Sequence, residues 1–415
     1  MVAELISDRG SKICRGCEGK DLAEILDLGA QPLPSEYADT ADEVLDKFPL
    51  ILRICKTCGL GQLGEFVLPE RIFHPKYPYL SSASSTWLVH SSTYAKEMVS
   101  QLNLTKDSLV IELASNDGYL LSIFQKLGVR VLGIEPANNV AEMARAQGVP
   151  TVVDFFGADV ARNISEEYGK PDLIVANNVF AHIPDMRDFT EGISILCDDQ
   201  TVVTIENPSF TTLLKNRYFD TIYHEHYSYV TANSVRKVAA DFGLELIDVQ
   251  ELKTHGGSNR YVLKKAGTEA PGPSVARVIQ SELGAGLLDQ AAWSSFARDV
   301  EESLSVARNW LLERKKEGAV VVGYGAAHKG NTFLNSIGNL SRILRYVVDA
   351  SIEKQGKFLP GSQIPVLAPS ALGEASPTDV IILPWNLSSE ISQRISEVLP
   401  NVRVWIAQPK LRQLA

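Results

Sequence analysis

The sequence predicts an α/β protein in three parts: a turn-rich N-terminal block followed by two Rossmann-like domains. Four of the five cysteines lie within residues 1–75. Short apolar runs alternate with helical patterns over residues 107–264, and this alternation restarts at residue 319 after a Gly- and Pro-containing linker at 265–274. Because strand–helix alternation is typical of parallel sheets, we expect helices to cover both faces of each sheet.

The strand positions follow from the apolar runs. In the central domain they are expected at 109–113, 131–135, 172–177 and 201–206. Two later runs, 244–252 and 259–264, are joined by a short loop and so predict an antiparallel pair at one edge of the sheet. Residues 275–316 look largely helical. The strands of the C-terminal domain are expected at 319–325, 344–350, 379–384 and 402–407.

Composition and charge limit the kinds of partner. The 415 residues are 45% hydrophobic and 22% charged, and 40 Lys and Arg against 50 Asp and Glu give a net charge of −10. An acidic chain is a poor binder of a nucleic-acid backbone. Neither a membrane-length apolar run nor a secretory signal is evident, and five cysteines are too few for a disulfide scaffold. We therefore expect a cytoplasmic protein with reduced thiols and a small-molecule substrate, binding neither nucleic acid nor membrane.

Two CxxC pairs in the N-terminal block predict a metal site. Cys14 and Cys17 form the first pair and Cys55 and Cys58 the second, with 37 residues between the pairs. Each pair can supply two of the four thiolates of a tetrahedral zinc site. A redox CxxC is a weaker alternative, since two copies would have to occur in one small region. A closed four-thiolate site leaves no open position for chemistry, so the zinc is expected to be structural.

The first strand–loop–helix of the central domain predicts a nucleoside site. In LVIELASNDGYLL (109–121), Ala114, Ser115 and Gly118 would let the backbone approach a ligand closely. Glu135 ends the next strand, where a carboxylate can accept hydrogen bonds from both ribose hydroxyls. The loop lacks GxGxxG, and Glu112 ends the first strand. This arrangement of acids is the pattern of S-adenosylmethionine (SAM) methyltransferases.

Later strand ends extend this prediction. Asp154, Phe155 and Phe156 could bond and stack on an adenine, and two asparagines follow the fourth strand at the carboxyl edge, where ligands lie in open parallel sheets. Each of these residues alone could equally be a cap or turn. The cofactor residues are expected to be Glu112, Ala114, Asn116, Gly118, Tyr119, Glu135, Pro136, Asp154, Phe155, Phe156, Asn177 and Asn178.

The densest group of titratable side chains is the segment Tyr223–Tyr227, with the sequence YHEHY. A histidine can remove a proton near neutral pH. HEH is not the HExxH metal motif. His224 and His226 would share a face in a strand and diverge in a helix. The alternative is a polar loop with structural histidines. THGGS, at 254–258, is a second candidate.

The chain resembles the SAM-dependent C-methyltransferases of deoxysugar biosynthesis, which act on nucleotide-linked 4-keto sugars for antibiotics or polysaccharides. The motifs that carry the resemblance run across nearly the whole length. They are the paired CxxC, YPYLSSASSTW (77–87), ELASNDGYLL (112–121), GIEPANNVA (133–141), ANNVFAHIPD (176–185), FDTIYHEHYSY (219–229), THGGSNR (254–260) and GYGAAHKGNTFLN (323–335). Relatives often have GGSLR where this chain has GGSNR.

The resemblance implies a division of labour between domains. Residues 1–75 would bind zinc, 76–266 would form a class I methyltransferase domain that binds SAM, and 267–415 would be a Rossmann-like domain that helps to hold the nucleotide sugar. His226 would be the general base that deprotonates carbon 3, and Glu225 would hold its tautomer. The other catalytic residues would be Tyr223, Tyr77 (in preference to Tyr79) and His224. The substrate-binding residues would be Tyr79, Ser81, His182, His255, Gly256, Ser258, Arg260, Tyr324, His328 and Lys329.

The loop Gly323–Gly330 of the C-terminal domain allows three interpretations. It begins like GxGxxG, although His328 takes the place of the third glycine, and Asp349 ends the next strand. It could be a weak NAD site, a cradle in which Lys329 and helix N–H groups meet a diphosphate, or a structural turn.

Four alternatives to methylation at carbon 3 therefore stay open. They are a C-5 methyltransferase, a sugar O-methyltransferase, an NAD-linked oxidoreductase, and an RNA-binding zinc module. The charge of −10 and the lack of interleaved basic and aromatic residues argue against the last of these. We expect a monomer.

Overall fold

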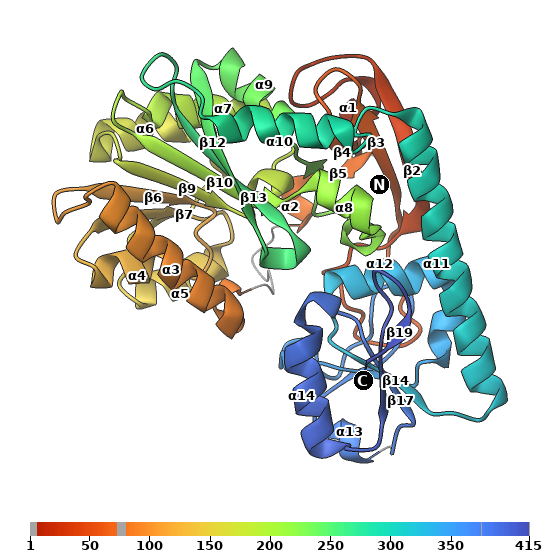
Figure 1. Cartoon of the computed structure of the whole chain (residues 1–415). Helices are drawn as coiled ribbons and strands as arrows, with labels where there is room; N and C mark the ends of the chain where they lie inside the picture. The colour runs from red at the N-terminus through yellow and green to blue at the C-terminus, as the bar shows by residue number, and fades with distance from the viewer. Residues whose placement is uncertain (1–5, 73–79, 375, 415) are drawn as a thin grey trace.

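The computed structural model describes residues 6–72, 80–374 and 376–414. They form four sheets with their helices, arranged as a central domain, an N-terminal domain beside it and a C-terminal domain below both (Figure 1). The predicted α/β class and the three-part organisation are confirmed. Tyr77 and Tyr79 lie outside the described residues.

The central domain contains a seven-stranded sheet in the order β12-β13-β10-β9-β6-β7-β8. The strands β10, β9, β6, β7 and β8 are parallel, while β12 and β13 form the predicted antiparallel pair at one edge. The bounds are β6 Leu109–Leu113, β7 Arg130–Ile134, β8 Thr151–Val152, β9 Leu173–Asn177, β10 Val202–Pro208, β12 Leu244–Leu252 and β13 Ser258–Lys265. All side chains of β6 are buried, as expected for a strand covered on both faces.

Helices cover both faces of this sheet. In Figure 1, α3 (Ser85–Gln101), α4 (Leu121–Lys126) and α5 (Asn138–Ala146) lie on one side. The opposite side carries α6 (Ala158–Tyr168), α7 (Met186–Leu196), α9 (Ala232–Asp241) and α10 (Pro273–Gly284). The carboxyl ends of the parallel strands are thereby left to the connecting loops, where the sequence predicts the cofactor.

The N-terminal domain contains a four-stranded antiparallel sheet in the order β11-β4-β3-β2. Three of its strands come from the N-terminal part of the chain: β2 (Leu22–Gln31), β3 (Phe48–Cys55) and β4 (Gly61–Leu63). The fourth, β11 (Ser228–Tyr229), comes from the segment that we expected to lie within the central domain. Its neighbours in the chain are therefore tied to the N-terminal domain. A second, two-stranded sheet pairs β1 (Ile6–Ser7) with β5 (Phe66–Val67).

The C-terminal domain contains a six-stranded sheet in the order β16-β15-β14-β17-β18-β19. Its strands are parallel except for β19. The bounds are β14 Val321–Tyr324, β15 Val347–Val348, β16 Val366–Leu367, β17 Asp379–Ile382, β18 Arg403–Ile406 and β19 Arg412–Gln413. The helices α12 (His328–Ile337) and α14 (Ser388–Val398) pack against it. This is the second Rossmann-like domain that the sequence predicts.

One long helix joins the two outer domains. The helix α11 (Gln290–Lys316) has 27 residues and therefore extends for about 40 Å. It runs along the N-terminal and C-terminal domains in Figure 1. Trp293, Phe296 and Trp310 on α11 belong to a hydrophobic cluster that also contains Leu52 of β3 and Val347 of β15. The outer domains thus share one core.

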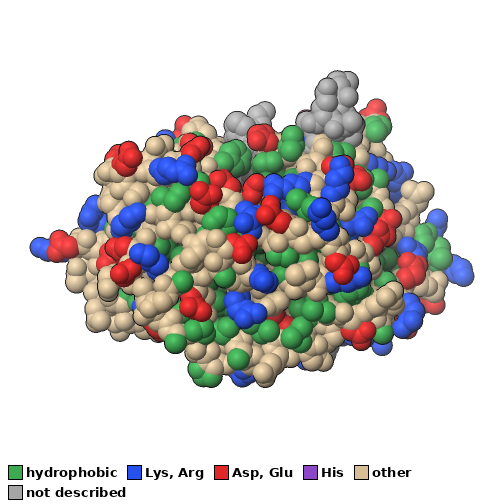
Figure 2. Space-filling view, turned by 90° about the horizontal axis from the view of Figure 1, so that it is seen from above, with side chains coloured by type: hydrophobic (Ala, Val, Ile, Leu, Met, Phe, Trp, Pro, Cys, Tyr) green, Lys and Arg blue, Asp and Glu red, His purple; other side chains and the backbone are tan. Residues whose placement is uncertain are grey.

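Charges of both signs are mixed on the face shown in Figure 2, with hydrophobic side chains between them. In the described part of the chain, we find no helix whose length and apolar character would allow it to cross a membrane.

Candidate active site

The loop after β6 is shaped by residues with left-handed backbone. Ala114, Asn116 and Gly118 have φ angles of 54°, 50° and 77°. A Cβ on Gly118 would lie 3.1 Å from the side chains of Ala144 and Val149, and the positive φ would strain any other residue. This glycine therefore lets the loop lie close to α5.

Glu135 connects this loop to the end of β7. Its carboxylate accepts hydrogen bonds from the backbone N–H of Asn116 at 3.0 Å and of Ala137 at 2.8 Å. Burial raises the pKa of Glu135 to about 7, although these two hydrogen bonds favour the carboxylate. The predicted acid therefore lies beside the predicted loop, at the carboxyl edge of the sheet.

Among the remaining predicted cofactor residues are three with an unsatisfied acceptor atom and two phenylalanines. Buried acceptors without a hydrogen-bond partner occur at Glu112 Oε2, Asn177 Oδ1 and Asn178 Oδ1. Such atoms suit a ligand that brings amino and hydroxyl donors, as SAM does. Phe155 is 43% exposed, whereas Phe156 packs edge-on against Phe189, with ring centroids 5.2 Å apart. Phe156 is half-buried and packs against the core cluster, so its stacking on adenine stays a prediction.

The other predicted cofactor residues lie in the core or in the loops at the carboxyl edge of the sheet. Tyr119 is buried among core residues, and Pro136 is half-buried directly after Glu135. Asp154 accepts the N–H of Phe155 at 2.8 Å. These positions keep Pro136 and Asp154 at the loop side of the sheet.

His226 is oriented by two hydrogen bonds. Its Nδ1 lies 3.0 Å from the backbone carbonyl of Thr221, and its Nε2 lies 2.8 Å from the hydroxyl of Tyr223. Since a carbonyl can only accept, Nδ1 carries the hydrogen and Nε2 presents its lone pair. Burial, with a contribution from His182, lowers the pKa of His226 well below its usual value. The ring is therefore neutral near pH 7 and can accept a proton at Nε2.

His182 reaches the same place from the loop after β9. Its ring lies edge-on to His226, with centroids 4.8 Å apart. Burial lowers the pKa of His182, so this ring too is mainly neutral. The structure thus brings together Tyr223, His226 and His182 from two separate segments.

Glu225 does not perform the task that we predicted for it. Its Oε2 lies 3.2 Å from Nδ1 of His328 in the C-terminal domain, and the carbonyl of Thr221 holds the His226 tautomer instead. Burial opposes the ionisation of Glu225, but His328 and His182 outweigh it and lower the pKa of Glu225 to about 2. Glu225 is therefore a buried carboxylate at a contact between domains.

His224 contacts a different part of the molecule from His226. Its Nε2 donates to the carbonyl of Phe48 in β3 at 3.1 Å, and its side chain is 1% exposed. Burial lowers the pKa of His224 to about 4. The structure does not bring His224 beside Tyr223, His226 and His182, because residues 224–225 form a turn that separates the two histidines.

The THGGSNR motif surrounds a buried ion pair that the sequence did not reveal. Arg260 donates to Glu206 at 2.9 Å, so it is not free for a ligand as we expected. Glu206 is fully buried and also contacts His90 Nε2 at 3.0 Å and the hydroxyl of Thr254 at 3.0 Å. These contacts outweigh burial and lower the pKa of Glu206. The sequence signal that could have identified Glu206 is its position at the end of β10, on the same edge of the sheet as Glu135.

His255 lies close to the cofactor edge. Its Nε2 is 3.2 Å from the side-chain amide of Asn178, and its ring lies 5.1 Å from that of Trp87. A Cβ on Gly256 would lie 2.7 Å from the ring of Trp385, so this loop touches the C-terminal domain. Among the other predicted substrate residues, Ser258 donates to Thr254 O, and Ser81 N–H donates to Asn116 at 2.8 Å.

The glycine-rich loop of the C-terminal domain is covered. The carbonyl of Ala326 accepts from the hydroxyl of Tyr37 at 2.6 Å and from Nζ of Lys354 at 3.0 Å. Tyr324 is mostly buried in the core. Lys329 donates to Asn386 at 2.8 Å and lies over the ring of Trp385. Burial lowers the pKa of Lys329, although Asp220 opposes this.

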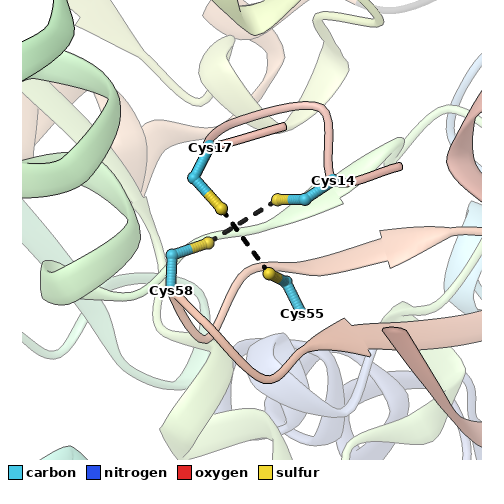
Figure 3. Close-up of side chains that lie close together, drawn as sticks. All are labelled: Cys14, Cys17, Cys55 and Cys58. Carbon is cyan, nitrogen blue, oxygen red and sulfur yellow. Dashed lines mark hydrogen bonds between the residues drawn. The ribbon is translucent and has the colours of Figure 1, made fainter. Parts of the chain in front are cut away.

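The four N-terminal cysteines converge on one point (Figure 3). Their sulfurs all lie within 4.8 Å of one another, and the pairs Cys14–Cys58 and Cys17–Cys55 are 3.6 Å apart. Tetrahedral zinc with bonds of about 2.3 Å places its sulfurs about 3.8 Å apart. The donor set and spacing therefore fit the predicted structural zinc.

Comparisons with known proteins agree with the three parts. Three protein-family models match the chain. "Putative zinc binding domain" matches residues 14–73, "Methyltransferase domain" matches residues 92–249, and "C-methyltransferase C-terminal domain" matches residues 253–408. The chain is 32% identical over 391 residues to C-methyltransferase NovU of Streptomyces niveus, covering 94% of this chain and 93% of that protein.

Two of the similar solved structures each cover less than half of the chain. Magnesium protoporphyrin IX methyltransferase of Synechocystis PCC 6803 with bound SAH has a TM-score of 0.35 and 14% identity, covering 43% of this chain and 83% of its own. PH0226 of Pyrococcus horikoshii OT3 has a TM-score of 0.37 and 12% identity, covering 47% and 97%.

The predicted cofactors are confirmed as SAM, bound by the central domain, and zinc, bound by the four cysteines. With the family models along the chain and NovU similar over nearly its whole length, this protein belongs to the family of SAM-dependent C-methyltransferases with an N-terminal zinc-binding domain.

Proposed function

We propose that the enzyme methylates carbon 3 of a nucleotide-linked 4-keto deoxysugar, in a pathway that makes sugars for antibiotics or polysaccharides. The observation that carries this proposal is the neutral His226 with its Nε2 lone pair beside Tyr223. A base with this geometry suits removal of a proton next to a ketone. The name of the relative, C-methyltransferase, supports a carbon acceptor.

SAM would supply an electrophilic methyl group. His226 Nε2 takes the proton from carbon 3, and the electrons of the broken C–H bond move to the ketone oxygen. The protonated ring then donates to the oxygen of Tyr223, since its Nδ1 stays bonded to Thr221. This frees the Tyr223 hydroxyl hydrogen to stabilise the enolate oxygen. Tyr77 is a second candidate donor.

We propose that the C-terminal domain binds the diphosphate. Lys329 lies in the first turn of α12, where its charge and the helix N–H groups both favour an anion. Its present partner, Asn386, is neutral and could be exchanged for a phosphate oxygen. His328, the residue before it, pairs with Glu225 close to His226. A nucleotide on α12 would therefore have its sugar near the base. We also propose that the enzyme acts as a cytoplasmic monomer.

The test is solvent exchange followed by product mass. Wild-type protein in D₂O without SAM should exchange the hydrogen on carbon 3 of the accepted 4-keto sugar, and adding SAM should increase the product mass by one methyl group. His226→Asn should bind SAM normally and lose at least about 1000-fold in both reactions. Methylation without exchange would support an O-methyltransferase, and exchange at carbon 5 would support the C-5 alternative. Binding of NAD in place of SAM would favour an oxidoreductase.

A further inference from the structure

The segment that carries His226 is attached to the N-terminal domain rather than to the central sheet. β11 pairs with β4 in an antiparallel register that places Ser228 opposite Gln62. The N–H of Leu63 donates to the carbonyl of Tyr227 at 3.0 Å. On the other side of His226, the side chain of His224 is hydrogen-bonded to Phe48. Both flanks of the proposed base are therefore held by the domain that binds zinc.

Arg15 connects this segment to the zinc site itself. It lies between the ligands Cys14 and Cys17 and is fully buried. Its guanidinium donates to Ser228 Oγ and to Leu63 O, both at 3.0 Å, and to the carbonyl of Tyr227. The side chain of Arg15 thus contacts Tyr227 and Ser228, the two residues that follow His226.

The charge of Arg15 has no carboxylate partner in the described part of the chain, where its guanidinium bonds only carbonyl and hydroxyl oxygens and lies over the ring of Phe66. An isolated buried cation is costly. Four thiolates around Zn²⁺ carry a net charge of −2, and Arg15 follows the first of them in the chain. The zinc site therefore offers the counter-charge that makes a buried arginine tolerable at this position.

We propose that Arg15 is a positioning residue through which the zinc-loaded CxxC turn fixes the main chain at Tyr227 and Ser228, and with it the ring of His226. Its effect on turnover rests on the proposed role of His226. The zinc is then required for the alignment of the base and not for the binding of SAM, because Glu135 and its loop belong to the central sheet.

The test uses the full-length, zinc-loaded protein with Arg15→Lys and the milder Ser228→Ala. Arg187→Lys is the matched control, because Arg187 also touches the CxxC turn, at the carbonyl of Gly16, but does not contact the base segment. Amide exchange by mass spectrometry, zinc content, SAM affinity and steady-state kinetics are measured on each.

For Arg15→Lys we expect kcat to fall at least about tenfold, faster amide exchange over residues 226–229, and SAM affinity within twofold of wild type. Ser228→Ala should show a smaller loss of about threefold, and Arg187→Lys should match wild type. Removal of zinc by a chelator should speed exchange over 226–229 while the strand 109–113 stays protected.

Unchanged exchange over 226–229 after zinc removal would overturn the proposal, as would unchanged exchange and kcat in Arg15→Lys. If Arg15→Lys fails to fold, Ser228→Ala and the chelator experiment decide. Amide exchange does not depend on the substrate. A coupling seen by exchange with no methylation of any 4-keto sugar would therefore contradict the proposed function and leave the positioning role supported.

Discussion

The two Rossmann-like domains use the same arrangement at their first loop. In the central domain, Glu135 accepts the N–H of Asn116 from the loop and the N–H two residues beyond itself. In the C-terminal domain, Asp349 accepts the N–H of Ala326 at 2.7 Å and that of Ser351, also two residues beyond, at 2.8 Å. In both domains a carboxylate at the end of the second strand closes the loop after the first.

The two loops differ in what other parts of the chain place against them. Lys354 Nζ lies 3.8 Å from the carboxylate of Asp349. The carbonyl of Ala326 accepts hydrogen bonds from Lys354 and from Tyr37 of the N-terminal domain. No Lys or Arg pairs with Glu135 within the described residues, and burial raises its pKa to about 7. One strand–loop–strand geometry therefore forms the predicted cofactor site in one domain and a joint between domains in the other.

The largest effect should come from exchanging these acids for alanine. Glu135→Ala should weaken SAM binding at least about 100-fold, because a carboxylate that accepts two hydroxyl hydrogens contributes about 1.5–3 kcal/mol per bond. Asp349→Ala should leave SAM affinity within twofold of wild type. Titration calorimetry on both variants checks this, with one SAM per chain and no NAD bound in wild type. Equal losses in the two variants would show that the domains do not differ as we describe.

Exchanging Asp349 should lower the stability of the protein although it leaves SAM binding unchanged. Asp349→Ala leaves two backbone N–H groups without their acceptor at a joint between domains, and each such loss costs about 1–3 kcal/mol. We expect the midpoint of thermal unfolding to fall by about 3–6 °C, since a protein of this size changes less per kcal/mol than a small domain. Asp349→Asn should lose less, because its carbonyl oxygen still accepts one bond. A midpoint within 1 °C of wild type for Asp349→Ala would argue against a joint at this position.

The pH dependence of SAM binding should identify Glu135 as the titrating group. Its raised pKa of about 7 means that the carboxyl is neutral below that pH and cannot accept from two hydroxyls. Affinity should therefore rise about tenfold from pH 6 to pH 8, and Glu135→Gln should lose this rise. The ligand-free protein has the opposite sign: the stability contributed by the neutral form is lost as pH rises through about 7. A flat wild-type affinity profile would contradict this assignment.

The loops, the cysteine site and the antiparallel strand pair could be predicted from the sequence because each depends on neighbours within about 40 residues. Contacts between distant segments could not. His224 and His226 are two residues apart, yet the first bonds a strand of the N-terminal domain and the second lies against Tyr223. The partner of Glu225 is about 100 residues away in the C-terminal domain. Spacing predicts which groups are available, whereas the direction of a side chain follows from packing of the domains.

The smallest effect should come from Tyr37→Phe, which removes one hydrogen bond to the Ala326 carbonyl and keeps the ring. Lys354 still donates to the same oxygen, so the loss should be about 1 kcal/mol, near 1–2 °C in the unfolding midpoint. SAM affinity should not change, because Tyr37 contacts the first loop of the C-terminal domain and not that of the central domain. Calorimetric melting of wild type, Tyr37→Phe and Lys354→Met would measure the two donors separately. If Tyr37→Phe allowed NAD to bind, the C-terminal loop would be a blocked cofactor site, and the difference between the domains would lie in this one phenol rather than in the whole joint.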